Sequence, residues 1–141
     1  MFGGWQIKSA LAALASVACW LLGGWDVLAQ ALVALIALDV LAGLARAFVE
    51  KRLNSSVMRH GLVRKSCYFI AIILAELVDR SVLHGAPAMR TLVISYLCAN
   101  EALSVLEHLG AVGVPLPRQL KQALEKVRHE LDTDDQGQPA E

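Results

Sequence analysis

Long apolar stretches separated by short polar breaks fill most of this chain, and they restrict it to a small set of folds. Four stretches can be drawn, at about residues 9–24, 26–49, 66–83 and 91–109. Hydrophobic residues make up 56% of the 141 residues, above the roughly 45–50% typical of soluble domains. A helix needs about 20 mostly apolar residues to cross the hydrocarbon core of a bilayer. The sequence therefore predicts an all-α integral membrane protein with about four transmembrane helices.

The last part of the chain has a different character. Residues 1–110 are expected to form the transmembrane domain and residues 111–141 a cytoplasmic tail. Pro115 and Pro117 interrupt any helix that continues from the fourth stretch. Residues 118–131 then carry their leucines and valine on one narrow stripe, as in an amphipathic helix. The acidic segment 132–141 is expected to be disordered.

The distribution of Lys and Arg predicts the topology. The break after the second stretch is rich in basic residues, namely Lys51, Arg52, Arg59, Arg64 and Lys65. Lys8 and four basic residues of the tail are expected on the same side, against Arg80 and Arg90 on the other. Loops rich in Lys and Arg stay in the cytoplasm. We therefore expect four crossings with both termini in the cytoplasm, and we interpret the basic break as a topology-determining loop.

The first apolar stretch could also be read as a signal peptide, because Ser16-Val17-Ala18-Cys19 resembles a lipoprotein cleavage site. However, Trp20-Leu21-Leu22 follows, where a processed protein would turn polar. We expect a retained span.

Three carboxylates interrupt the apolar stretches: Asp39 in the second, Glu76 in the third and Glu101 in the fourth. An ionisable group at the bilayer centre costs roughly 2.5–3.5 kcal/mol and usually faces a bundle interior or a water-filled path. Counted from the outer surface at about 1.5 Å per residue, all three lie within ~10–20 Å of it. Arg46 is the only deep cation expected. The sequence thus predicts that water or protonation compensates some of these carboxylates.

Helical spacing gathers the polar residues of the fourth stretch on one face. At about 100° per residue, this arc of about 120° contains Asn100, Glu101, Ser104, Glu107 and His108. In the second stretch, Asp39 and Arg46 share a face with Gly43, which would allow close approach by another helix. In the third, Glu76 and Arg80 are spaced for a structural ion pair. The two polar faces could simply hold helices together by hydrogen bonds, or they could face water.

Other kinds of site have no support in the sequence. The net charge is zero, with 13 basic and 13 acidic residues, so nothing indicates nucleic-acid binding. Phosphate-binding glycine loops, nucleophile elbows and metal-ligand spacings are missing, and we expect no enzyme activity, cofactor or metal. The three cysteines lie in apolar stretches, where they are expected to pack as small hydrophobic residues.

As a set, three segments make the chain resemble the phage holins that serve lysis or toxin secretion. They are Leu38-Asp39-Val40-Leu41-Ala42-Gly43, Ala99-Asn100-Glu101-Ala102-Leu103-Ser104-Val105-Leu106-Glu107 and Gly113-Val114-Pro115. The resemblance implies a homo-oligomer that forms lesions in the bacterial cytoplasmic membrane. It also implies functional pairing with a peptidoglycan hydrolase or a toxin that leaves through those lesions. On this hypothesis the lumen is lined by the polar faces, with Asp39, Arg46, Asn100, Glu101, Ser104 and Glu107.

Two other functions fit the same pattern. A small proton-coupled exporter would also place a carboxylate inside a four-helix bundle. Alternatively, the chain could be a membrane anchor that recruits a cytoplasmic partner through residues 118–131.

Overall fold

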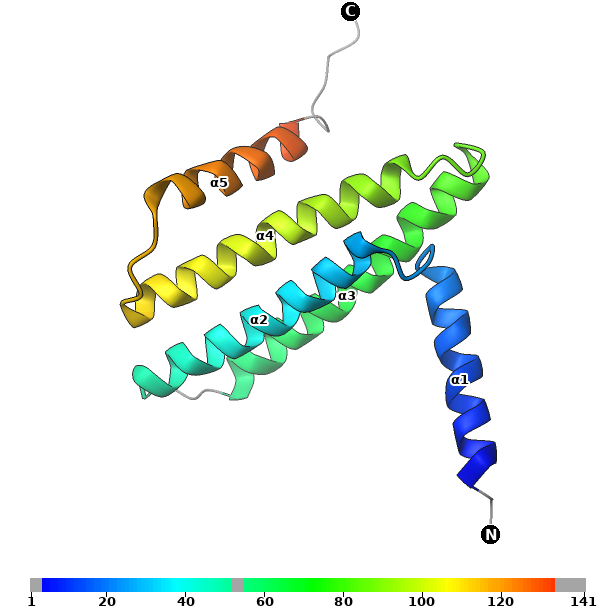
Figure 1. Cartoon of the computed structure of the whole chain (residues 1–141), viewed down its shortest axis with the longest axis horizontal. Helices are drawn as coiled ribbons and strands as arrows, with labels where there is room; N and C mark the ends of the chain where they lie inside the picture. The colour runs from blue at the N-terminus through cyan, green and yellow to red at the C-terminus, as the bar shows by residue number, and fades with distance from the viewer. Residues whose placement is uncertain (1–3, 52–54, 134–141) are drawn as a thin grey trace, which may run out of the picture.

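A computed structural model describes residues 4–51 and 55–133, which form five α-helices. The helices are α1 (Gly4–Leu21), α2 (Val27–Val49), α3 (Ser55–Ser81), α4 (Ala88–Val112) and α5 (Arg118–Thr133). Helices α2, α3 and α4 form an elongated bundle, α1 projects from one end of it, and α5 folds back along α4 (Figure 1). The described residues contain no β-strand, so the all-α prediction is confirmed.

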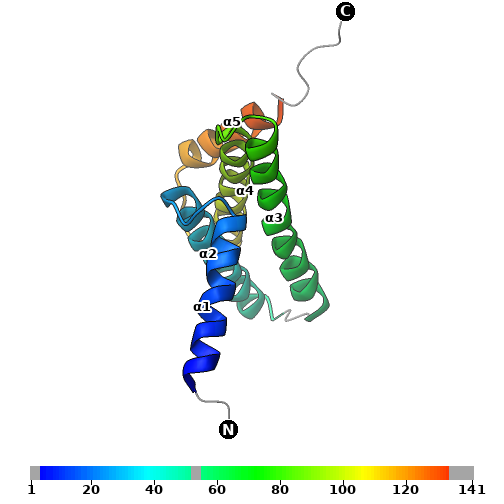
Figure 2. The same ribbon diagram turned by 90° about the vertical axis from the view of Figure 1, so that its right-hand side faces the viewer.

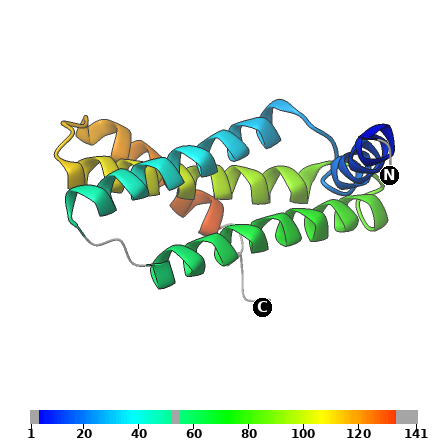
Figure 3. The ribbon, with the colours of Figure 1, turned by 90° about the horizontal axis from the view of Figure 1, so that it is seen from below.

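Helix α4 is the centre of the bundle. Helices α2 and α3 each pack along α4 rather than on each other, as the view in Figure 3 shows. The core that joins the three helices is small and aliphatic, and consists of Leu32, Ile72, Ile94 and Leu97. Helices α2 and α3 therefore meet mainly through α4.

The ends of the bundle helices are fixed by specific caps. The Asp26 carboxylate accepts a hydrogen bond of 2.9 Å from the Ala29 backbone N–H and starts α2. Pro87 cannot cap α4 with its side chain, and Asp79 of α3 does so instead. Its two carboxylate oxygens accept hydrogen bonds of 2.8 Å from the backbone N–H groups of Met89 and Arg90. Backbone N–H groups in the first turn of a helix have no partner within the helix. The two hydrogen bonds to Asp79 therefore fix the end of α3 to the start of α4.

Helix α1 stands apart from the bundle. Within Gly4–Leu21 no residue is buried, and α1 projects away from the bundle beyond its last turn (Figures 1 and 2). There, the Trp20 ring lies 4.3 Å from the Arg80 guanidinium carbon. The apolar side chains of α1, including Trp5, Leu11 and Leu14, are exposed. Among the described residues, α1 is therefore an apolar helix that packs against no other element along most of its length.

The expectation of four membrane spans is met only in part. Among the described residues, α2 alone is both long and apolar enough by sequence to cross a membrane. Charged side chains make α3 and α4 less apolar than α2, although both helices are long enough. The four-span arrangement remains a prediction.

The basic loop expected between residues 51 and 65 is wrong for most of its length. Helix α3 begins at Ser55, so Arg59, Arg64 and Lys65 lie on the helix. The physical reason is that residues 55–65 contain no proline and only one glycine to interrupt a helix. Lys51 adopts a positive φ of 52° in the turn after α2, and Arg52 lies outside the described residues. Helix α5 continues to Thr133, and the predicted disorder from residue 134 onward also falls outside them.

Candidate functional site

Three charged side chains from three helices meet inside the bundle. Lys65 Nζ on α3 lies 3.0 Å from Asp39 Oδ2 on α2, and it donates a hydrogen bond to Glu101 Oε2 on α4. Asp39 is 7% exposed and Glu101 only 2%. We call Asp39, Lys65, Glu101 and the adjacent His108 the central charged cluster. Removing one partner of such a buried pair leaves an uncompensated charge and typically costs about 3–5 kcal/mol.

From the sequence, Lys65 was expected only to determine topology. The expectation that Arg46 is the only deep cation is wrong, because Lys65 lies between two buried carboxylates. The inward position of Lys65 could have been inferred from the spacing of its neighbours in the sequence. Tyr68 and Ile72 follow it at i+3 and i+7, and Ile72 belongs to the buried core. Lys65 therefore lies on the inward stripe of α3 once the helix is extended back to Ser55. Its four-carbon stem lets the ammonium reach both carboxylates.

The central charged cluster is not fully compensated. With both carboxylates ionised, Lys65 protonated and His108 neutral, the formal net charge of the cluster is −1. Asp39 Oδ1 and His108 Nδ1 are buried and have no hydrogen-bond partner among the described residues. His108 Nε2 lies 3.6 Å from Asp39 Oδ1, too far for a good hydrogen bond. Asp39 Oδ1 therefore lacks a hydrogen-bond donor in the closed bundle.

Gly43 makes room for His108 beside this oxygen. A Cβ atom at Gly43 would lie 3.4 Å from His108 Nε2. The close approach predicted for Gly43 therefore involves a side chain of α4. It does not bring two helix backbones together by itself, but it keeps the imidazole next to Asp39.

A pocket of about 550 Å³ opens beside the cluster, between α2 and α3. Its walls are apolar and include Val40, Leu44, Met58 and Leu62. Its floor is polar and is made by Asp39, Lys65 and His108. We call this pocket the α2–α3 groove. It combines apolar surface with the one unpartnered carboxylate oxygen of the cluster.

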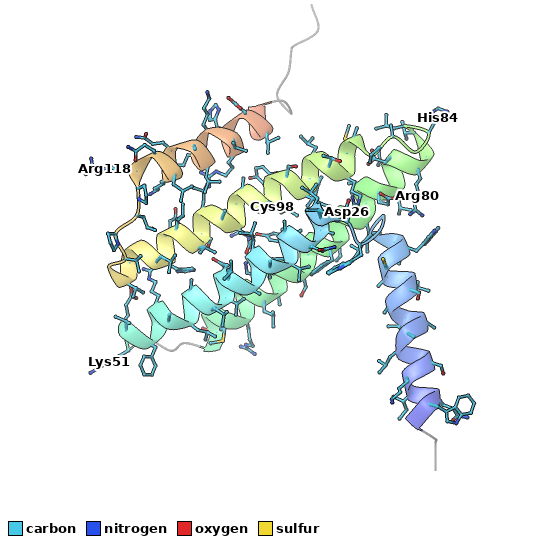
Figure 4. All side chains as sticks on the ribbon, viewed as in Figure 1. Asp26, Lys51, Arg80, His84, Cys98 and Arg118 are labelled. Atoms are coloured by element: carbon cyan, nitrogen blue, oxygen red, sulfur yellow. The ribbon has the colours of Figure 1, made fainter. Side chains whose placement is uncertain are left out.

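A second charged cluster ties together the opposite end of the bundle. Arg90, 3% exposed, donates hydrogen bonds of 2.6 Å to Asp26 Oδ2 and to the Leu22 carbonyl oxygen, and its Nε lies 3.8 Å from Glu76 Oε2. The hydrogen bond from Arg90 holds the pKa of Asp26 near 2, down from an ordinary value of 3.8. Arg80 Nε donates 2.6 Å to Glu76 Oε1. Figure 4 labels Asp26 and Arg80 at the end from which α1 departs.

The Glu76–Arg80 pair expected from the sequence is thus present, with Arg90 as an additional partner of Glu76. From the sequence, Arg90 was expected only to mark the outer side of the membrane. A buried role for it was not evident, because its partners Asp26 and the Leu22 carbonyl come from a distant turn.

The remaining predicted residues do not share one site. Arg46 pairs with Glu50 at 2.8 Å and not with Asp39, because Glu50 is one helical turn away and both are accessible. Asn100 Nδ2 donates 3.3 Å to the Tyr68 hydroxyl. Ser104 is half-buried and Glu107 is exposed. The predicted polar face of α4 therefore divides: Glu101 and His108 point into the bundle, whereas Glu107 faces outward.

Comparisons with known proteins agree with the resemblance seen in the sequence. A family model for the bacteriophage holin family matches residues 16–129. An uncharacterised 14.9 kDa protein of Clostridium perfringens is 32% identical, over 87% of this chain and 93% of the relative. A Bacillus subtilis protein of unknown function is 36% identical, over 80% and 79%. A probable holin of Bacillus phage phi105 is 32% identical, over 67% and 70%. No solved structure matches the chain.

Proposed function

The chain belongs to the bacteriophage holin family, and we propose that it accumulates in the cytoplasmic membrane, oligomerises and opens lesions there. A peptidoglycan hydrolase or a toxin made in the cytoplasm would leave through these lesions. The family is one of membrane proteins without enzymatic activity, so the function lies in assembly and opening. We further propose four crossings by α1–α4, with α5 and both termini in the cytoplasm.

The observation that carries this proposal is the central charged cluster inside the bundle. The outward sides of α2 and α3 expose large apolar residues such as Leu41, Ile70 and Leu74. A monomer with this surface can dissolve in lipid, because Lys65 lies between the two buried carboxylates. A lesion wall needs the opposite, namely polar side chains that face water. Separating α2 from α3 would deliver Asp39, Lys65 and Glu101 to water.

The packing of the bundle favours such an opening. Helices α2 and α3 both pack on α4 and approach each other closely at few positions. Moving one away from the other therefore breaks few apolar contacts. The cost of separating the Lys65 ammonium from the carboxylates is offset by hydration, because charges in water need no partner. Closed and open arrangements can thus be of similar free energy.

Lysis timing tests the proposal. The chain is expressed from an inducible promoter with a cell-wall hydrolase, and the onset of lysis is recorded. Glu101→Leu brings the cluster from −1 to 0 and removes a polar group from the lumen, so lysis should be late or absent. Lys65→Met brings the cluster to −2 in the closed bundle, so lysis should come early. Glu125→Gln, an exposed carboxylate of α5, is the control and should keep the normal schedule.

Membrane fractions must contain each variant in equal amount for the comparison to count. If Glu101→Leu and Asp39→Leu both lyse cells on the normal schedule, the cluster has no role in opening. The cargo distinguishes an exporter from a holin. Release of the folded hydrolase supports a lesion, whereas saturable release of small molecules alone would support the exporter.

A further inference from the structure

The α2–α3 groove lacks an occupant that its chemistry specifies. Its walls are apolar, and its floor holds the unpartnered Asp39 Oδ1 within a cluster of net charge −1. A buried carboxylate oxygen without a hydrogen bond is costly. A suitable occupant brings apolar surface and a single positive charge placed to meet Asp39.

Helix α1 has both properties. Its exposed side chains are almost all apolar, and Lys8 is the only charged residue between Gly4 and Leu21. The ion pairs of the described residues do not include Lys8. Ala12, Ala15 and Cys19 follow Lys8 on the same face. Small residues on this face would let α1 approach other helices closely.

The positions of the two charges along their helices also match. Lys8 lies 13 residues before Leu21, and Asp39 lies 12 residues after Val27. At about 1.5 Å per residue, both groups are ~18–20 Å from the outer ends of their helices. An α1 that crosses the membrane antiparallel to α2 therefore brings Lys8 to the depth of Asp39.

The α1 of the same chain is held away from this groove. Arg80 donates a hydrogen bond of 2.7 Å to the Trp20 carbonyl oxygen, and Arg90 donates to the carbonyl oxygens of Leu22 (2.6 Å) and Gly24 (3.2 Å). These contacts hold the α1–α2 turn against the bundle end, and α1 leaves from there at an angle (Figures 1 and 2). In the arrangement of Figures 1 and 2, α1 of the same chain stays outside the groove, so the groove is free for α1 of another molecule that has turned to run antiparallel to α2.

We propose that α1 of a second copy of this chain fills the α2–α3 groove, with its Lys8 against Asp39 Oδ1. The inference rests on the proposed holin function, since it requires α1 to cross the membrane. Each copy gives one helix and receives one, which is a heterologous contact that can close into a ring. The added charge brings the central charged cluster from −1 to 0, and the groove becomes the assembly site of the lesion.

Disulfide cross-linking in membranes tests the contact. Cys19, Cys67 and Cys98 are first replaced by alanine, and two differently tagged chains are then co-expressed. One carries Ser9→Cys and the other Val40→Cys, positions at matching depth on α1 and in the groove. Mild oxidation should give a mixed dimer at least several-fold more abundant than with Leu38→Cys, which lies at similar depth on another face of α2 and is exposed.

The charge pairing is tested in the same assay. Lys8→Glu should lower the yield of the mixed dimer several-fold, and Lys8→Arg should preserve it. In a chain with Asp39→Asn, the difference between Lys8→Glu and Lys8→Arg should disappear. Yields equal to the Leu38→Cys control, or a cross-link formed only when both cysteines are in one chain, would overturn the proposal.

The cysteine-free parent is assayed for lysis in parallel. A parent that releases the hydrolase on schedule while no mixed dimer forms refutes the α1 contact and leaves the holin function standing. A parent and a native chain that both fail to release the hydrolase refute the proposed function itself.

Discussion

Replacing Lys65 by methionine should destabilise the protein far more than its position near the start of α3 suggests. The Lys65 side chain is 13% exposed, and it faces carboxylates whose side chains are 9% (Asp39) and 2% (Glu101) exposed. Methionine keeps most of the apolar stem but leaves two buried negative charges together. The expected loss is about 3–5 kcal/mol in the free energy of unfolding. Such a loss raises the unfolded fraction more than a hundredfold, at about 1.4 kcal/mol per factor of ten.

Denaturant unfolding of the purified protein in detergent micelles, followed by circular dichroism, measures this effect. Arg64→Met is the matched control, because Arg64 is the neighbouring basic residue and is exposed. It should change the free energy of unfolding by no more than about 0.5 kcal/mol. Adding Asp39→Asn and Glu101→Gln to Lys65→Met should restore most of the loss, since the cluster then holds no charge. Equal effects of Lys65→Met and Arg64→Met, or no rescue in the triple variant, would refute the buried cluster.

Three further predictions concern the end cluster and the tail. Because the pKa of Asp26 falls from 3.8 to about 2 on folding, its contribution to stability is complete above about pH 4 and is lost as the pH falls towards 2; in acid titrations of unfolding, Asp26→Asn should remove that part of the pH dependence. Gly23 and Gly24 both have positive φ, but only at Gly23 would a Cβ meet other atoms, at 2.6 Å from Glu76 Cδ and 2.7 Å from Arg90 Cδ. Gly23→Ala should therefore lower the melting temperature more than Gly24→Ala, and an equal shift would argue against the clash. Deleting residues 118–141 should change the time of lysis without preventing it, whereas a complete loss of function would favour the membrane anchor.

The sequence allowed the helical class to be predicted, and it placed Asp39 and Glu101 on polar faces that turn to either the bundle interior or water, because each follows from local periodicity. Apolar runs of helical length define the elements, and a carboxylate in such a run has few places to go. The partners of these carboxylates could not be found in this way. Lys65 pairs with residues 26 and 36 positions away, and Arg90 pairs with Asp26 across 64 positions. Such pairs depend on how helices are arranged around α4, which no single segment encodes.

The prediction of a basic loop between residues 51 and 65 failed for the same reason, because it also ignored how the helices are arranged. Counting Lys and Arg indicates on which side of a membrane a segment lies, but the count is blind to the face that each residue takes on a helix. Arg59 and Arg64 are exposed, whereas Lys65, next in the chain, turns inward. One residue of rotation, about 100°, separates a topological signal from a structural ion pair.

The buried lysine changes what the carboxylates require. If Asp39 and Glu101 had no cation, they would have to be protonated or wetted before the protein could enter the bilayer. With Lys65 between them, the bundle can enter with its cluster nearly neutral, and only one negative charge remains to be compensated. That single charge is small enough to permit a stable monomer and large enough to favour any neighbour that supplies a cation. A cluster of net charge −1 therefore favours assembly without preventing insertion. A fully neutral cluster would not attract a cation from a neighbour, and a fully acidic cluster would hinder insertion.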